Sequence, residues 1–325
     1  MVRLASALAA SVAATLVIPA VARAEIAVAA RPELGLQGGS ESFDLAFAIP
    51  QASDPTTSYE ASSELTYPLN TTLGGVAASV DAGSFAFFGS VHTNLHHPWG
   101  KMVDSDFITA RTASQSQTIE FSHTESRAEL RLWNAELGVG ARVAQLSPAV
   151  RALVTAGFRY ESYAHDVRGA SGWQLDQTGS RVSVALPDDT LALTYDTRYR
   201  IAFLGVRVDG QLSPNAVFVT EARVLGSWSS HEDDHVLRHK IARSEPYGLG
   251  FALSGGPALR VGKSMHLGLS LQLQYLRAVS GSLKQRYYAD DPYLDGDQTQ
   301  LAIPEVDFSF TLLRATLLAF AEARF

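Results

Sequence analysis

Two short acidic segments hold the residue types best suited to chemistry in this chain. They are Asp104-Ser105-Asp106 and the run "HEDDH", from His231 to His235. Residues i and i+2 of an extended chain point to the same side, so Asp104 and Asp106 can share one face, as can Asp233 and His235. An aspartate beside a histidine orients the imidazole and stabilises its protonated form. His235 could therefore act as a general base toward water.

A second pair of carboxylates facing such a dyad predicts a hydrolytic site. Two nearby carboxylates can hold a water molecule and share one proton, because like charges push one pKa upward. The combination could hydrolyse an amide or an ester, and spacing does not separate the two. Each segment alone is also typical of a solvated loop or a calcium ligand pair, and His231, Asp233 and His235 could form a transition-metal site.

The elements that must position these residues are predicted to be β-strands. Apolar and polar residues alternate with a period of two almost throughout, most clearly from Leu267 to Tyr275, and helical spacing is nearly absent. Strands of soluble sandwiches are commonly about 5–6 residues long, and these alternating runs are longer. Long strands with an apolar outside and a polar inside are what a transmembrane barrel requires.

Turn signals set the expected number of strands. Tight turns are predicted at Gly74-Gly75, Ser147-Pro148, Ser213-Pro214-Asn215 and Gly262-Lys263, and long polar loops near residues 51–62, 92–117, 166–189, 229–240 and 285–300. Four turns between five loops give an all-β fold, a ten-stranded antiparallel transmembrane β-barrel with long extracellular loops. The even strand number places both chain ends on the periplasmic side.

The two ends of the chain predict an outer-membrane protein of a Gram-negative bacterium. Residues 1–24 combine Arg3, an apolar stretch and Ala22-Arg23-Ala24, which predicts a secretory signal peptide and leaves residues 25–325 as a single barrel domain. The final Phe325, on an alternating strand, resembles the C-terminal signature of bacterial outer-membrane barrels. Acidic residues outnumber basic ones by 33 to 26, which argues against nucleic acid as a partner, and the absence of cysteine excludes disulfides.

Strand parity gives several residues an expected side. Glu221 and Arg223 fall on the lumen side of their strand, and the same parity carries His231, Asp233 and His235 into the lumen. A ladder of paired charges is also predicted in the lumen, from Arg127, Glu129 and Arg131. Aromatic girdle residues are expected toward strand ends at Tyr160, Tyr163, Tyr199, Tyr287 and Tyr288.

Both acidic segments resemble motifs of the omptin family, the outer-membrane proteases of Gram-negative bacteria. "GKMVDSDF" is similar to the family's Asp-x-Asp motif, and Gly226-Ser227-Trp228 followed by "HEDDH" is similar to its Asp-x-His motif. The segments Thr155–Gly169 and Thr194–Val206 resemble the family's middle strands, and the resemblance runs from about residue 60 to the C terminus. It implies a ten-stranded barrel whose extracellular rim carries the active site of an aspartic-type endopeptidase.

The resemblance also implies a role for each catalytic residue. Asp233 and His235 would form the dyad in which His235 activates water, and Asp104 and Asp106 would form the facing couple that positions this water. The attacking group would be the water itself, without a covalent acyl-enzyme. No metal or other cofactor is expected, and the expected partners are peptide or protein substrates at the cell surface.

The chain departs from the family where substrate and lipid would bind. The family's acidic pocket has an aspartate where this chain has His231, which with Glu232 is expected to contact substrate, and no counterpart of the pocket's other acid is found from Glu41 to Glu60. Lipopolysaccharide, a possible activator, would retain only Arg198 of its binding residues. Parity groups Arg198 with Asp196 and Arg200, which would turn it toward the lumen.

Two other functions stay open on sequence grounds. The loss of an acidic pocket residue at His231 is compatible with a non-enzymatic barrel that acts as an adhesin or binding surface. A barrel that hydrolyses lipids would need its base and nucleophile on the outer face, and the expected lumen side of Asp233 and His235 argues against this.

Overall fold

The chain folds as an all-β protein. The computed structural model describes residues 26–49, 57–96, 100–288 and 306–325. In those ranges every regular element is a β-strand except one 3-10 turn at Val236–Arg238. No helix in the described part of the chain is long and apolar enough to cross a membrane. The predicted signal peptide, residues 1–24, lies outside the described residues.

Fourteen strands form one sheet that closes on itself, with every pair antiparallel and β14 hydrogen-bonded to β1. They are β1 (Ile26–Ile49), β2 (Ser58–Pro68), β3 (Thr71–Ala82), β4 (Phe85–Asn94), β5 (Lys101–Arg111), β6 (Ser116–Ser147), β7 (Val150–Leu175), β8 (Arg181–Ser213), β9 (Ala216–His235), β10 (Lys240–Ser244), β11 (Tyr247–Val261), β12 (Met265–Ser280), β13 (Ser282–Tyr287) and β14 (Val306–Arg324). Four barrel strands consist of two pieces each, namely β2/β3, β4/β5, β10/β11 and β12/β13, so the ring has ten strands, as predicted.

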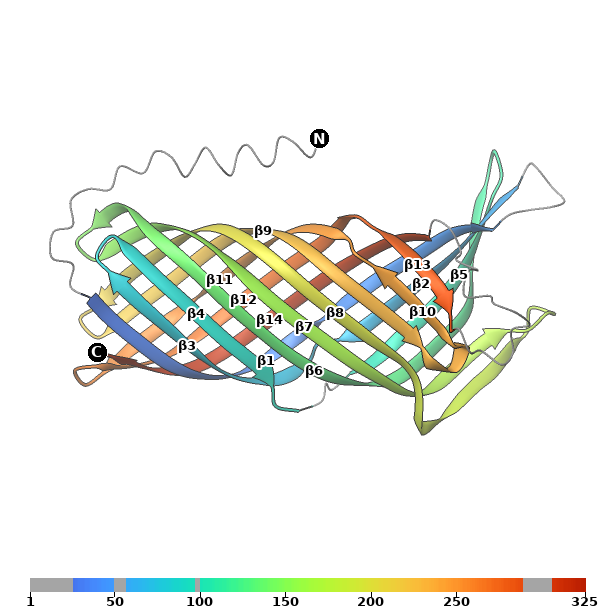
Figure 1. Ribbon diagram of the computed structural model, residues 1–325, viewed down its shortest axis with the longest axis horizontal. Helices are drawn as coiled ribbons and strands as arrows, with labels where there is room; N and C mark the ends of the chain where they lie inside the picture. Colours follow the sequence, from blue (N-terminus) through green and yellow to red (C-terminus); the bar gives the residue numbers. More distant parts are fainter. Residues whose placement is uncertain (1–25, 50–56, 97–99, 289–305) are drawn as a thin grey trace.

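One end of the barrel carries the short turns, the start of β1 and the C terminus (Figure 1); it is called the turn end below, and the opposite end is the loop end. The predicted turns near Pro148, Pro214 and Gly262 are confirmed. The turn predicted at Gly74-Gly75 is wrong, because both residues lie inside β3 and the chain turns at Gly83, whose φ is 69°. A Cβ on Gly75 would approach the His92 ring to 2.3 Å, so this glycine makes room for a neighbouring side chain.

Much of the polar sequence predicted to form loops continues as strand. β6 is 32 residues long and β8 is 33 residues long, whereas about 9–11 residues of tilted strand are enough to cross a bilayer. The strands are therefore much longer than a bilayer requires, and the barrel is extended toward the loop end (Figure 1).

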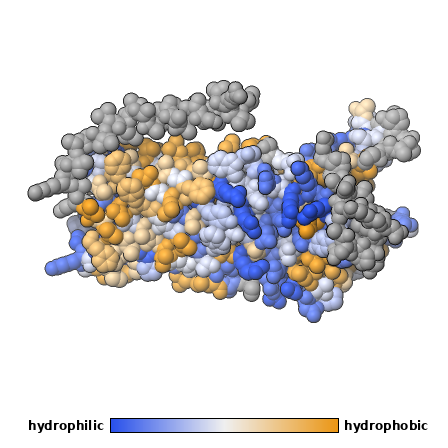
Figure 2. Space-filling view, viewed as in Figure 1, coloured by the Kyte–Doolittle hydropathy of each residue, from blue (hydrophilic) through white to orange (hydrophobic). Residues whose placement is uncertain are grey.

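The outer surface changes from apolar to polar along the barrel (Figure 2). Toward the turn end, exposed side chains such as Leu137, Leu204 and Leu249 form an apolar belt. The edge of the belt that faces the loop end is marked by outward aromatic residues. They include Trp133, whose ring centroid lies 4.8 Å from that of Tyr160. Further belt-edge contacts join Trp228 and Tyr247 at 6.5 Å.

Beyond the belt, the polarity of the two faces is reversed. Arg127, Glu129 and Arg131 were predicted to face the lumen, but they lie on the outside, with ion pairs from Arg127 to Glu129 (3.1 Å) and from Arg131 to Asp166 (3.3 Å). The inward positions of the same segment are the buried residues Ala128, Leu130 and Leu132. The physical reason is that this part of the wall faces water on the outside and a packed core on the inside. Tyr163 and Tyr199, predicted as girdle residues, likewise belong to that core and are buried.

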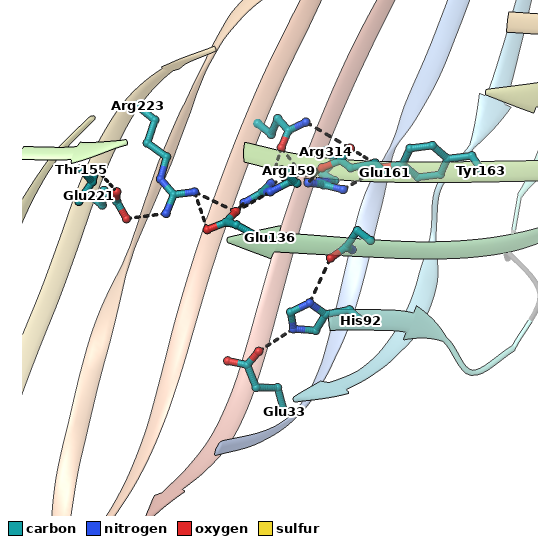
Figure 3. Close-up of polar contacts among 12 residues, drawn as sticks. Glu33, His92, Glu136, Thr155, Arg159, Glu161, Tyr163, Glu221, Arg223 and Arg314 are labelled. Atoms are coloured by element: carbon teal, nitrogen blue, oxygen red, sulfur yellow. Dashed lines mark hydrogen bonds and ion pairs between the residues drawn. The ribbon is translucent and has the colours of Figure 1, made fainter. Parts of the chain in front are cut away.

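Inside the belt, the lumen is filled with paired charges (Figure 3). Glu136 accepts hydrogen bonds from Arg159 Nε at 2.6 Å and from Arg223 at 2.9 Å. Glu161 pairs with Arg314 at 2.5 Å and accepts a hydrogen bond from the Tyr163 hydroxyl at 2.9 Å. These bonds link β6, β7, β9 and β14 across the barrel, below the apolar core that lies toward the loop end.

Candidate active site

The proposed dyad lies on the inner face of β9 at the loop end. Glu221 faces inward on this strand, and the pairing with β8 runs without a bulge up to Asp234, so His231, Asp233 and His235 also face inward, as parity predicted. His235 Nε2 lies 2.9 Å from Asp233 Oδ2. The side chain of Asp233 is 4% exposed and that of His235 is 14% exposed, so the imidazole is the more accessible partner.

The aspartate couple comes from the opposite part of the wall. Asp104 on β5 lies directly across from Leu65 on β2, and Asp106 lies across from Ser63. Residues directly opposite in a ladder share a face, and Leu65 is buried in the core, so both aspartates face inward. Ser63 Oγ donates to Asp104 Oδ1 at 3.3 Å.

An aromatic floor joins these two parts of the wall. Tyr67, two residues after Leu65 on β2, stacks on Tyr195 of β8 with ring centroids 4.4 Å apart and planes inclined by 19°. Tyr195 is in turn the cross-strand neighbour of Asp233. Phe43 packs against both rings, at 5.7 Å from Tyr67 and 4.8 Å from Tyr195. The couple and the dyad therefore lie on two sides of one stacked pair of tyrosines, and this group of residues is called the cleft below.

The charges of the cleft act on one another. The pKa of Asp104 is raised to about 6, mainly by burial and next by the neighbouring Asp106, while His235 and Arg238 oppose the rise. Asp233 adds a smaller upward contribution. Asp104 thus binds a proton more readily than an ordinary aspartate does, as expected for a buried carboxylate beside another negative charge.

A sealed cluster of polar groups lies beneath the dyad. His231 is 2% exposed, and its ring nitrogens lie 2.8 Å from Tyr195 Oη and 3.0 Å from Ser229 Oγ. Burial lowers the pKa of His231 to about 3, so its imidazole is neutral. Its Nδ1 lies 3.7 Å from a carboxylate oxygen of Glu41.

Glu41 is the acid that sequence reasoning did not find near His231. Its carboxylate is fully buried and accepts hydrogen bonds from Tyr195 (3.1 Å), Tyr199 (2.6 Å) and Thr197 (3.2 Å). A usable signal was present, because Glu41 has the same parity as Phe43 and therefore lies on the inward face of β1. Three donors hold this carboxylate inside the protein.

Two predicted binding residues lie away from the cleft. Glu232 is on the outer face of β9, where its carboxylate pairs with Arg243 Nε at 2.6 Å. Arg198 is exposed on the outer face of β8, so its expected lumen position is wrong. Thr197 and Tyr199 occupy the inward positions on either side of it, with Tyr195 one inward step further, because the packed core takes the aromatic residues and leaves the charged ones in water.

Sequence reasoning missed three residues of the cleft: Tyr67 in its floor, and Arg238 and Lys240 beside the dyad. Lys240 lies directly opposite His235 in the β9–β10 ladder and so shares its inward face. Burial lowers the pKa of Lys240, and Asp233, Asp106 and Asp104 oppose this change. The pairing of Lys240 with His235 could not be predicted from a single lysine in a polar segment. Among the described residues, no three His, Asp or Glu side chains are grouped so as to hold a metal ion.

Comparisons with known proteins give a structural match without a sequence match. No protein-family model and no curated protein matches the chain. Among solved structures, the outer membrane protease OmpT from Escherichia coli superposes with a TM-score of 0.71 at 13% identity, covering 92% of this chain and 97% of that one. The translocator domain of the autotransporter NalP from Neisseria meningitidis gives a TM-score of 0.33 at 12% identity, over 99% of this chain and 95% of that one. The chain is thus a ten-stranded β-barrel with the fold of an outer-membrane protein.

Proposed function

We propose that this protein is an omptin-like endopeptidase of the Gram-negative outer membrane, with its active site at the barrel mouth facing outside the cell. The observation that carries the proposal is the meeting of a carboxylate pair on β5 and an Asp–His dyad on β9 above a single aromatic floor. Burying an acidic cluster of this kind costs free energy, and such clusters are found mainly at functional sites. A binding surface has no need of it, so the endopeptidase is the better-supported function.

The geometry supports a water-mediated reaction. His235 accepts a proton from water as the water oxygen attacks the peptide carbonyl carbon, and the electron pair of the carbonyl moves to its oxygen. Asp233, 2.9 Å from His235, stabilises the imidazolium that forms. The imidazolium then gives its proton to the leaving nitrogen as the C–N bond breaks. Asp104 and Asp106 hold the water in line.

The charges around the dyad bear on the substrate class. His231 is neutral and Glu41 is saturated with hydrogen bonds, so neither offers a free negative charge beneath the dyad. Lys240 adds a cation beside His235. We therefore expect no strong preference for a basic side chain next to the cleaved bond. Of the two residues expected to contact substrate, His231 lies under the cleft, whereas Glu232 could meet only the parts of a substrate that cross the outer rim.

Lipopolysaccharide is proposed as a partner on the outer face, with outer-membrane lipids around the belt. Arg198 lies opposite Ser162 in the β7–β8 ladder. Ser162 lines a shallow outer groove together with Arg131, Trp133 and Asp196. Two arginines beside an aromatic belt residue suit the phosphate groups and acyl boundary of such a lipid.

The test is peptide-library digestion by protein refolded with lipopolysaccharide. We expect turnover by the wild type and a loss of at least about 10³-fold in His235→Ala and Asp104→Asn, since removal of one member of a catalytic unit has effects of this size. Asp166→Asn is the matched control, because this aspartate lies on the outer face in an ion pair with Arg131. Turnover by His235→Ala at the wild-type rate would exclude the proposed site, and absence of turnover in the wild type would favour a binding barrel.

A further inference from the structure

The aspartates of the cleft supply many hydrogen-bond acceptors, and Arg238 and Lys240 beside the dyad supply charged donors. The Asp233 carboxylate accepts no hydrogen bond from any described residue, its contact with His235 being an ion-pair contact. Asp104 receives one hydroxyl bond, the 3.3 Å bond from Ser63. Ionised carboxylates can only accept. Peptide hydrolysis, however, puts negative charge on the carbonyl oxygen, and that oxygen needs a donor.

Tyr67 supplies an unused donor at this place. Its side chain is fully buried, and its hydroxyl makes no hydrogen bond with any described residue. A buried hydroxyl without a partner destabilises the folded state, so native proteins rarely keep one without a reason. The neighbouring tyrosine Tyr195 shows the contrast, since its hydroxyl lies 3.1 Å from Glu41 and 2.8 Å from His231.

The position of Tyr67 relates it to both halves of the site. Along β2 it is one inward step from Leu65, which lies opposite Asp104. Across the barrel its ring stacks on Tyr195, which lies opposite Asp233. The negative charges of Asp233 and Asp104 both act on its hydroxyl, and with burial they keep the pKa of Tyr67 well above its ordinary value. The hydroxyl therefore keeps its proton throughout the working pH range.

We propose that the Tyr67 hydroxyl is a catalytic hydrogen-bond donor, which binds the carbonyl oxygen of the scissile peptide as this oxygen becomes negative. The inference rests on the proposed endopeptidase function. No proton is transferred: as water attacks and the carbonyl electron pair moves to oxygen, the O–H of Tyr67 donates to that oxygen, and the bond is released when the carbonyl reforms. The packing with Tyr195, Phe43 and His165, whose ring centroid is 4.9 Å from that of Tyr67, fixes the direction of the donor.

The test is Tyr67→Phe, which keeps the stacked ring and removes only the hydroxyl. We expect kcat to fall by about 10²–10³-fold, the effect of losing one oxyanion donor, with KM nearly unchanged. The thermal midpoint should stay the same or rise, because no hydrogen bond within the protein is lost. The control is Tyr163→Phe, whose hydroxyl bonds to Glu161 and Arg314; it should lower the midpoint and leave kcat unchanged.

The outcomes separate this inference from the function on which it rests. Wild-type turnover with an unchanged kcat in Tyr67→Phe would overturn the role of Tyr67 and leave the endopeptidase intact. A fall in kcat together with a lower thermal midpoint would assign Tyr67 a structural role and would also overturn its role as a donor. Absence of turnover in the wild type would overturn the endopeptidase and, with it, this inference.

Discussion

At the residue scale, the site is made of groups held in unfavourable states. The best example is Asp104, whose pKa is raised to about 6 mainly by burial and by Asp106. Sequence spacing identified both acidic segments and the inward side of Asp233 and His235. It could not give the register of Asp104, because the preceding segment is irregular and only the pairing with β2 fixes its side.

Removing the charge of Asp104 should therefore stabilise the protein. The folded state binds a proton at Asp104 more tightly than the unfolded chain, so wild-type stability falls as pH rises from about 4 to about 6. Asp104→Asn removes this dependence and should be more stable than the wild type at pH 7 by about 1–2 kcal/mol, after allowance for solvent screening. Unfolding in urea at pH 4 and pH 7 would measure the difference in unfolding free energy between Asp104→Asn and wild type. A difference that is no larger at pH 7 than at pH 4 would contradict the prediction.

Other residues of the site escaped the sequence because their roles depend on contacts across the barrel. Glu41 and His231 are 190 residues apart in the chain numbering, yet lie within 3.7 Å of each other. Arg198 was given the wrong side, because strand parity says which residues share a face but not which face meets the lumen.

At the element scale, each long strand keeps the same alternation of inward and outward residues, but the side that is apolar changes along its length. Within the belt the outward residues are apolar, and beyond it the inward residues are. The sequence predicted the strands and their number well, because alternation is visible whichever face is apolar. It placed the Arg127, Glu129 and Arg131 ladder inside because it applied the pattern of a membrane-spanning strand to a part of the wall whose inner face is the apolar one.

Two substitutions on β6 should separate these patterns. Leu137 and Ile119 are both exposed on this strand, at 73% and 48%, but Leu137 lies in the belt and Ile119 near the loop end. Leu137→Arg should lower the unfolding free energy by about 2–4 kcal/mol, because a charge then faces lipid, whereas Ile119→Arg should change it by under about 0.5 kcal/mol. Equilibrium unfolding from lipid vesicles measures both, and equal losses would contradict the proposed position of the belt.

At the scale of the whole molecule, the closed barrel is what makes the site. The couple on β5 and the dyad on β9 are more than 120 residues apart in sequence, and the three long strands β6, β7 and β8 lie between them along the ring. They can meet only because the wall closes and the core under the loop end draws its sides together through the Tyr67–Tyr195 stack. Local pattern cannot reveal such a contact, which is why the cleft floor was not predicted.

The central claim is that the couple and the dyad act as one catalytic unit. The most direct measurement is kcat/KM for peptide cleavage by wild type, Asp104→Asn, His235→Ala and the double variant. Groups that act together show strongly non-additive losses. We expect the double variant to lose no more activity, within about a factor of ten, than the worse single variant. Losses that multiply across the two substitutions would show that the pairs act independently and would contradict the shared site.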